Sequence, residues 1–155
     1  MIDTLLFDFS KVILFLKDPN YSGTLNGLYR ESLSSGKPFS FWDYFELNSE
    51  LVDYLKILKD KFSLYLFTSG TIQEAPELKK TVDELFTKIY SAEKMGYSKT
   101  DPEAYKFITS DLNRIPSEIA YIDDQWENIQ TAQSFGIRGI QYHDNPQLFS
   151  ELSQL

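Results

Sequence analysis

The chain has 155 residues, and 15 Lys and Arg against 23 Asp and Glu give it a formal net charge of −8. Its length fits one domain, while an apolar fraction of 42% excludes global disorder. The acidic balance argues against a general binder of DNA or RNA, because phosphate backbones require clustered basic side chains. The chain has no cysteine, which excludes disulfides, thiolate metal sites and thiol nucleophiles.

The first residues do not have the pattern of a secretory signal. Asp3 places a negative charge before the apolar run, and no basic segment precedes it. No uncharged apolar stretch approaches the roughly 20 residues that cross a bilayer. We therefore expect a cytoplasmic protein with no membrane partner.

Short apolar runs predict a set of buried strands. Each is too short for a typical helix and is bounded by polar or turn residues. The three clearest runs are Thr4–Phe9, Phe62–Phe67 and Ile119–Ile122, and two weaker ones are Lys88–Tyr90 and Arg138–Tyr142.

Segments with helical spacing alternate with these strands. The first follows a potential N-cap at Asn48, the second follows Pro76, and the third begins at Asp101-Pro102. The fourth runs from Trp126 and stops at Gly136. This alternation predicts an α/β fold: a three-layer, Rossmann-like parallel sheet of about five strands with helices on both faces.

Residues 17–45 interrupt the alternation after the first strand. They are rich in Ser, Gly, Asn and Pro with interspersed aromatic residues, and they are longer than a connection requires. One interpretation is a partly helical loop packed on the surface; the other is a small lid over a site. We expect a single domain over residues 1–155, with residues 17–45 as a small cap insert.

Polar residues end the predicted strands. In an open parallel sheet, ligands bind beyond the carboxyl ends of the strands. Counted along the chain, the first strand ends in Asp8-Phe9-Ser10 and the second in Thr68-Ser69. The fourth strand ends in Asp123-Asp124. Lys99 lies in a loop just before a predicted helix.

Carboxylates converging on one edge would repel one another unless a cation lay among them. Asp8, Asp123 and Asp124 carry three negative charges, Lys99 returns one positive charge, and a divalent ion would bring the site to neutrality. A site with oxygen ligands alone favours Mg²⁺. It could hold a phosphate group, with a carboxylate oxygen as nucleophile and the hydroxyls after the second strand as donors.

This constellation resembles the haloacid dehalogenase superfamily, most of whose members are phosphatases. Leu-Leu-Phe-Asp-Phe-Ser-Lys-Val is similar to the first motif, with Asp8 as the aspartyl nucleophile. Leu-Tyr-Leu-Phe-Thr-Ser is similar to the second, with Thr68 as the phosphate-binding hydroxyl and Ser69 beside it. The third motif matches around Lys99, although Thr100 replaces the first proline of its Pro-Asp-Pro turn.

The fourth motif matches closely over residues 119–137. The resemblance implies that Mg²⁺ is held by Asp8, by the side chain of Asp124 and by the backbone carbonyl of Ser10. It also implies that Asp123 and Asn128 support the metal and Lys99. The expected function is a Mg²⁺-dependent phosphatase that acts on a small phosphorylated metabolite through an aspartyl-phosphate on Asp8, as a monomer or dimer.

Two positions depart from the pattern of the superfamily. Ser10 replaces the Asp that usually acts as general acid and base, and Lys11 replaces a usual Gly. Lys11 could crowd the site or hold a second anionic group of the substrate. These departures motivate an alternative, a catalytically weakened protein that binds a phosphorylated ligand or a protein partner. A two-component receiver is disfavoured because its acidic pair follows the first strand, and His143 is given no role.

Overall fold

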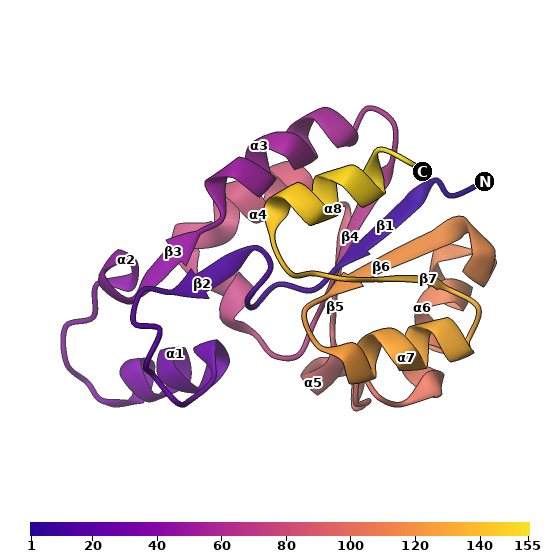
Figure 1. Ribbon diagram of the computed structural model, residues 1–155. Coiled ribbons are helices and arrows are strands. Elements are labelled where there is room, and N and C mark those ends of the chain that lie inside the picture. The colour runs from indigo at the N-terminus through magenta and orange to yellow at the C-terminus, as the bar shows by residue number, and fades with distance from the viewer.

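The main sheet has five parallel strands in the order β5-β4-β1-β6-β7, which confirms the predicted fold class. The structure is a computed structural model that describes residues 1–155. Figure 1 shows the strands running side by side at the centre of the molecule. Their bounds are β1 Thr4–Phe7, β4 Ser63–Thr68, β5 Lys88–Ser91, β6 Ile119–Asp123 and β7 Arg138–Gln141.

Helices cover both faces of the sheet, with α3 and α8 on one side and α7 on the other in Figure 1. Successive side chains of a strand point to opposite faces, so Leu5 and Phe7 join a core cluster with α3, α4 and α8, while Leu6 joins a second cluster with α6 and α7. The helix bounds are α3 Ser49–Leu58, α4 Lys79–Leu85, α5 Ala92–Met95, α6 Pro102–Leu112, α7 Trp126–Ser134 and α8 Asn145–Leu152. Short 3₁₀ turns are η1 Ile72–Glu74, η2 Pro76–Leu78 and η3 Pro116–Glu118.

Residues 17–45 are termed the insert below. They lie beyond the edge of the sheet at which β1 ends (Figure 1). An antiparallel pair, β2 Leu14–Leu16 and β3 Phe45–Leu47, brackets the insert. Between these strands are α1 Leu25–Ser34 and α2 Phe41–Tyr44. The rings of Tyr29 and Phe41 meet edge to face at 5.8 Å, and both residues pack into the main core cluster of the domain.

Most helix ends follow the sequence signals. The side chains of Asn48 and Asp101 cap α3 and α6, and Gly136 has a φ of 96° after α7. Pro76 begins a 3₁₀ turn rather than an α-helix, and α8 was not predicted. None of the helices combines the length and the apolar composition that a membrane span requires.

Candidate active site

A tight turn follows β1 and presents Asp8 at the edge of the sheet. The backbone N–H of Asp8 still donates to the carbonyl of Ile122 at 2.8 Å, but the chain then turns away. The carbonyl of Phe9 accepts from the backbone N–H groups of Ile13 at 2.8 Å and Leu14 at 3.1 Å. Asp8 and Phe9 therefore lie outside the strand, although both belong to the apolar run that predicted it.

The ammonium of Lys99 pairs with two carboxylates, that of Asp8 just after β1 and that of Asp123 at the end of β6. Its ammonium lies 2.5 Å from Asp8 Oδ1 and 3.0 Å from Asp123 Oδ2, and its side chain is only 5% exposed. The hydroxyl of Tyr105 donates to the Lys99 carbonyl at 2.7 Å and to the Asn128 carbonyl at 3.1 Å. Tyr105 thus fixes the backbone of the Lys99 loop against α7.

Asp123 is fully buried, and donors from four residues surround its carboxylate. One carboxylate oxygen accepts from Lys99, from the Asn128 amide at 3.1 Å and from the Tyr121 hydroxyl. The other accepts from the backbone N–H of Gln125 at 2.8 Å. With four donors, Asp123 is committed to positioning its neighbours, since a carboxylate has about four lone-pair sites.

Asp124 has different surroundings from its neighbour in the chain. It is partly exposed, lines a cavity and receives no hydrogen bond from another side chain. Oxygen atoms of Asp8, Asp123 and Asp124 lie within 4.8 Å of one another. Because Oδ2 of Asp8 also accepts no hydrogen bond, Asp8 and Asp124 each offer a carboxylate oxygen to a shared cation.

Two buried hydroxyls near the cluster have no hydrogen-bond partner in the protein, Ser10 Oγ and Thr68 Oγ1. An unpaired buried hydroxyl costs about 1–3 kcal/mol, so such groups point to a ligand. The backbone carbonyl of Ser10 also accepts no backbone hydrogen bond. An all-oxygen donor set with spare acceptors fits a hard divalent cation such as Mg²⁺.

Burial and charge shift the protonation of the cluster. Burial raises the pKa of Asp8 to about 7, against the opposing pull of Lys99, and the charge of Asp123 adds to the rise. Burial opposes the charge of Lys99, but Asp8 and Asp123 more than offset it and raise the pKa of Lys99. Burial and then Asp123 raise the pKa of Asp124, while Lys11 and Lys99 lower it. A cation among the carboxylates would favour their ionised forms and so lower the pKa values of Asp8 and Asp124.

A cavity of about 290 Å³ opens above the cluster. Asp8, Ser10, Ser69 and Asp124 line its sheet side, and Thr24, Leu25 and Asn26 of the insert line the opposite side. Asn26 Oδ1 accepts from the backbone N–H groups of Thr71 at 3.0 Å and Ile72 at 2.9 Å. The insert is therefore attached to the loop after β4 and lies over the site.

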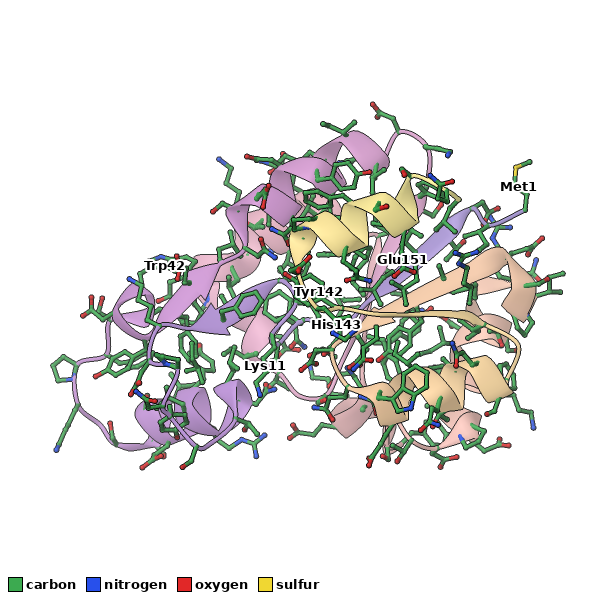
Figure 2. The ribbon with its side chains drawn as sticks, viewed as in Figure 1. Met1, Lys11, Trp42, Tyr142, His143 and Glu151 are labelled. Atoms are coloured by element: carbon green, nitrogen blue, oxygen red, sulfur yellow. The ribbon has the colours of Figure 1, made fainter.

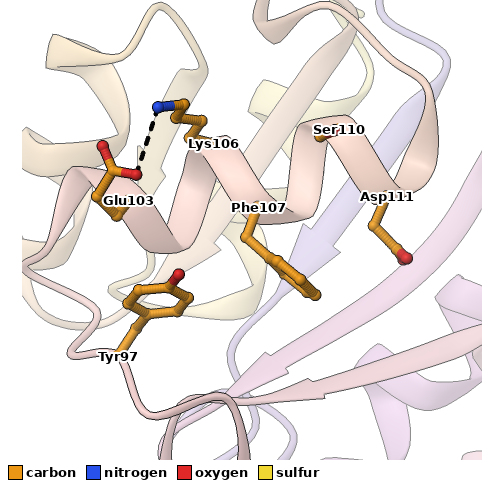
Figure 3. Close-up of a pocket in the computed structure, with 6 residues that line it drawn as sticks. All are labelled: Tyr97, Glu103, Lys106, Phe107, Ser110 and Asp111. Atoms are coloured by element: carbon orange, nitrogen blue, oxygen red, sulfur yellow. Dashed lines mark ion pairs between the residues drawn. The ribbon is translucent and has the colours of Figure 1, made fainter.

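A second hollow, of about 380 Å³, lies along α6 and is shown in Figure 3. Five of its six lining residues belong to one exposed face of that helix, and the sixth is Tyr97. Its ion pair, between Lys106 and Glu103 at 3.4 Å, joins two exposed side chains. None of the buried polar residues of the cluster lines this hollow.

The structure brings together the residues that the sequence singled out. Asp8, Lys99, Asp123 and Asn128 are linked by hydrogen bonds, and Asp124 lies beside them. Three residues were not predicted to belong to the site: Tyr105, Tyr121 and Asn26. Tyr121 could have been noticed as a hydroxyl within a buried apolar strand, but the partners of Tyr105 and Asn26 lie on other elements.

The haloacid dehalogenase-like hydrolase family matches residues 36–136 of this sequence. The chain therefore belongs to the haloacid dehalogenase-like hydrolases, as the four motifs predicted.

Two curated relatives are phosphatases. D-ribitol-5-phosphate phosphatase of Bacteroides thetaiotaomicron is 26% identical over 116 residues, which cover 70% of this chain and 56% of that protein. A sesquiterpene phosphatase of Aspergillus oryzae is 26% identical over 111 residues, covering 70% of this chain and 57% of that protein. The chain thus spans a little over half the length of these relatives.

Solved structures share the fold. A haloacid dehalogenase family enzyme of Bacteroides thetaiotaomicron, in complex with magnesium and inorganic phosphate, superposes with a TM-score of 0.69. The two chains are 21% identical, and the match covers 96% of this chain and 100% of that one. At this identity the likeness is one of fold.

Proposed function

We propose that the protein is a Mg²⁺-dependent phosphatase that hydrolyses small phosphomonoesters through an aspartyl-phosphate on Asp8. The observation that carries this proposal is the cluster of Asp8, Lys99 and Asp124 beside two unpaired buried hydroxyls. Two curated phosphatases among its relatives support the same class of reaction, as does a structural neighbour that binds magnesium and phosphate.

In the first step an oxygen of the Asp8 carboxylate attacks phosphorus, and the bond from phosphorus to the leaving oxygen breaks. Thr68 and Ser69 would donate hydrogen bonds to the phosphoryl oxygens, and the Lys99 ammonium would stabilise the charge that develops on them. Asp8, Asp124 and the Ser10 carbonyl would hold Mg²⁺, which when bound supplies further positive charge to the phosphoryl group.

In the second step a water molecule attacks the phosphorus of the aspartyl-phosphate. Inorganic phosphate leaves and the carboxylate of Asp8 is regenerated. Both steps require a proton transfer, to the leaving oxygen and then from the water. The Ser10 hydroxyl can donate a hydrogen bond to the leaving oxygen, but it cannot exchange protons readily near neutral pH. Solvent water would therefore supply the first proton and take up the second.

The insert limits the size of the substrate. It closes one side of a cavity of about 290 Å³, and Asn26 holds it to the loop after β4. A small metabolite fits such a space, whereas a folded macromolecule would require the insert to move. We therefore assign a small phosphorylated metabolite as substrate.

Hydrolysis of p-nitrophenyl phosphate and of a panel of sugar and nucleotide phosphates with Mg²⁺ tests the proposal. We expect activity in the wild type, loss of activity in Asp8→Asn, and a gain in Ser10→Asp, because general acid–base help contributes about 10²–10⁴-fold. Absence of turnover across the panel, with phosphate and Mg²⁺ still bound, would instead assign a binding protein. The serine at position 10 is the observation that favours this second candidate.

A further inference from the structure

Lys11 adopts a backbone conformation that its residue type disfavours. Its φ is 63°, in the left-handed region, where a residue with a Cβ costs about 1 kcal/mol or more relative to glycine. The turn after β1 therefore suits a glycine at this position. A strained lysine at the edge of a candidate active site indicates that its side chain has a use there.

The Lys11 ammonium is free to bind a ligand. Lys11 lines the same cavity as Asp8 and Asp124. Figure 2 shows Lys11 at the junction between the insert and the sheet. It is close enough to Asp124 to lower the pKa of that carboxyl. Yet it forms no ion pair within 4.0 Å. Glu93, which lines the same cavity, is instead paired with Arg30 at 2.9 Å.

No negative charge of the site remains to balance the Lys11 ammonium. The three carboxylates of the cluster would be balanced by Lys99 and one divalent ion. Glu93, which also lines the cavity, is already neutralised by Arg30. Lys11 therefore adds a positive charge to a site that is balanced without it.

The place of Lys11 in the sheet separates it from the phosphoryl donors. Thr68 ends β4 and Ser69 follows it, on one side of β1, whereas Asp124 follows β6 on the other side. Lys11 follows β1, which lies between β4 and β6, and it lines the cavity together with Thr24, Leu25 and Asn26 of the insert. Its ammonium can therefore meet a ligand in that cavity from a position separate from the Thr68 and Ser69 hydroxyls.

We propose that Lys11 determines specificity by binding a second anionic group, a carboxylate or another phosphate, on the leaving moiety of the substrate. The inference rests on the proposed phosphatase function and narrows its substrate class to phosphomonoesters with two anionic groups. Glycine, which the turn prefers, would abolish this selection.

A matched pair of substrates tests the selection. 3-Phosphoglycerate and glycerol 3-phosphate have the same length, but only the first has a carboxylate opposite the phosphate. We expect wild-type kcat/KM to favour 3-phosphoglycerate at least tenfold, Lys11→Met to remove that ratio, and Lys11→Arg to retain most of it. An unchanged ratio in Lys11→Met, or an equal loss on both substrates, would overturn the proposal.

A binding measurement separates this proposal from the phosphatase function. 3-Phosphonopropionate and propylphosphonate have C–P bonds that the reaction does not cleave, and they differ in one carboxylate. With Mg²⁺ present, calorimetry should show at least tenfold tighter binding of 3-phosphonopropionate to the wild type, and equal binding of both to Lys11→Met. Equal affinities in the wild type would contradict the role of Lys11 even if phosphomonoesters are hydrolysed. A preserved preference without any hydrolysis would contradict only the phosphatase function.

Discussion

Asp123 and Asp124 are adjacent residues with opposite surroundings. Asp123 is fully buried and accepts four hydrogen bonds, including one from Lys99 at 3.0 Å. Asp124 faces the cavity without a side-chain partner. The first therefore holds the site together, while the second is available to a ligand.

Substitution of each residue by asparagine should separate these roles. We expect Asp123→Asn to lower the unfolding free energy by about 3 kcal/mol, because it leaves Lys99 with one buried partner. Asp124→Asn should leave stability within about 0.5 kcal/mol of wild type in the absence of metal. Urea unfolding in a chelating buffer measures both values, and equal losses would contradict the assignment.

The strain at Lys11 has a measurable cost. Lys11→Gly and Lys11→Met both remove the charge, but only glycine relieves a φ of 63°. We expect the glycine variant to be more stable than the methionine variant by about 1 kcal/mol, measured by urea unfolding. Equal stabilities would show that the turn tolerates a side chain at no cost.

At the residue scale, the sequence identified the charged groups and two residues that support them, Asp123 and Asn128, but not the tyrosines that also position them. Asp8 was identified because a carboxylate within an apolar run is costly without a partner. Tyr105 was assigned only to a helix face, because its hydrogen bonds to the Lys99 and Asn128 carbonyls depend on how α6 packs against α7. The catalytic and metal roles of the charged groups stay predictions.

Among the elements, α1 and η1 are joined through one side chain. Asn26 Oδ1 accepts two backbone hydrogen bonds from the start of η1, and a Cβ on Gly70 would come within 2.5 Å of that atom. Gly70 thus allows the close approach of the insert to the loop after β4.

Asn26→Ala should loosen the insert. Removal of the acceptor leaves two backbone N–H groups unpaired, which costs about 1–3 kcal/mol. We expect faster hydrogen exchange at the amides of Thr71 and Ile72 and across residues 17–45. Asn20→Ala, at an exposed position of the insert, is the matched control and should leave exchange unchanged. Unaltered exchange in Asn26→Ala would mean that the packing of the insert's aromatic residues into the main core holds the insert without Asn26.

The strand β5 is tied to α6 through Asp111. Lys88 and Tyr90 donate to Asp111 Oδ2 at 2.5 Å and 2.6 Å, and these bonds lower the pKa of Asp111. A lowered pKa stabilises the fold at pH values above the unfolded pKa of about 4 and ceases to do so as pH falls through the folded pKa.

Asp111→Asn should therefore destabilise the protein at pH 7 by about 0.5–1 kcal/mol, since the pair is near the surface. The difference from wild type should shrink as pH falls below about 4. Urea unfolding at several pH values measures this dependence. Glu103→Gln, which removes an exposed ion pair on the same helix, should have a smaller effect. A constant difference at all pH values would contradict the role of the carboxylate charge.

At the same scale, strands were easier to predict than short helices. The buried strands are continuous apolar runs, and all five appeared within about two residues of the expected bounds. The helix α8 was missed although Asp144 caps it and Pro146 lies in its first turn, because only Leu148 and Leu152 of the helix are buried. Four-residue α5 is too short for any periodic pattern.

At the scale of the whole molecule, the fold and the family could be predicted because four different motifs follow one another along the chain in the family's order, at or near strand ends. The haloacid dehalogenase-like fold places those ends at one edge, and the order of strands in the sheet follows from it. The way in which the insert closes over that edge could not be predicted, since it depends on contacts between segments about 45 residues apart in the chain.

The proposed active site requires Asp8 and Asp124 to share one divalent cation. Calorimetric titration of Mg²⁺ into the wild type, Asp8→Asn and Asp124→Asn tests this most directly, with Glu103→Gln as a control far from the cluster. We predict one binding site in the wild type and the control, and loss of that site in each of the two cluster variants. Mg²⁺ binding that survives both substitutions, or its absence from the wild type, would contradict the proposed active site.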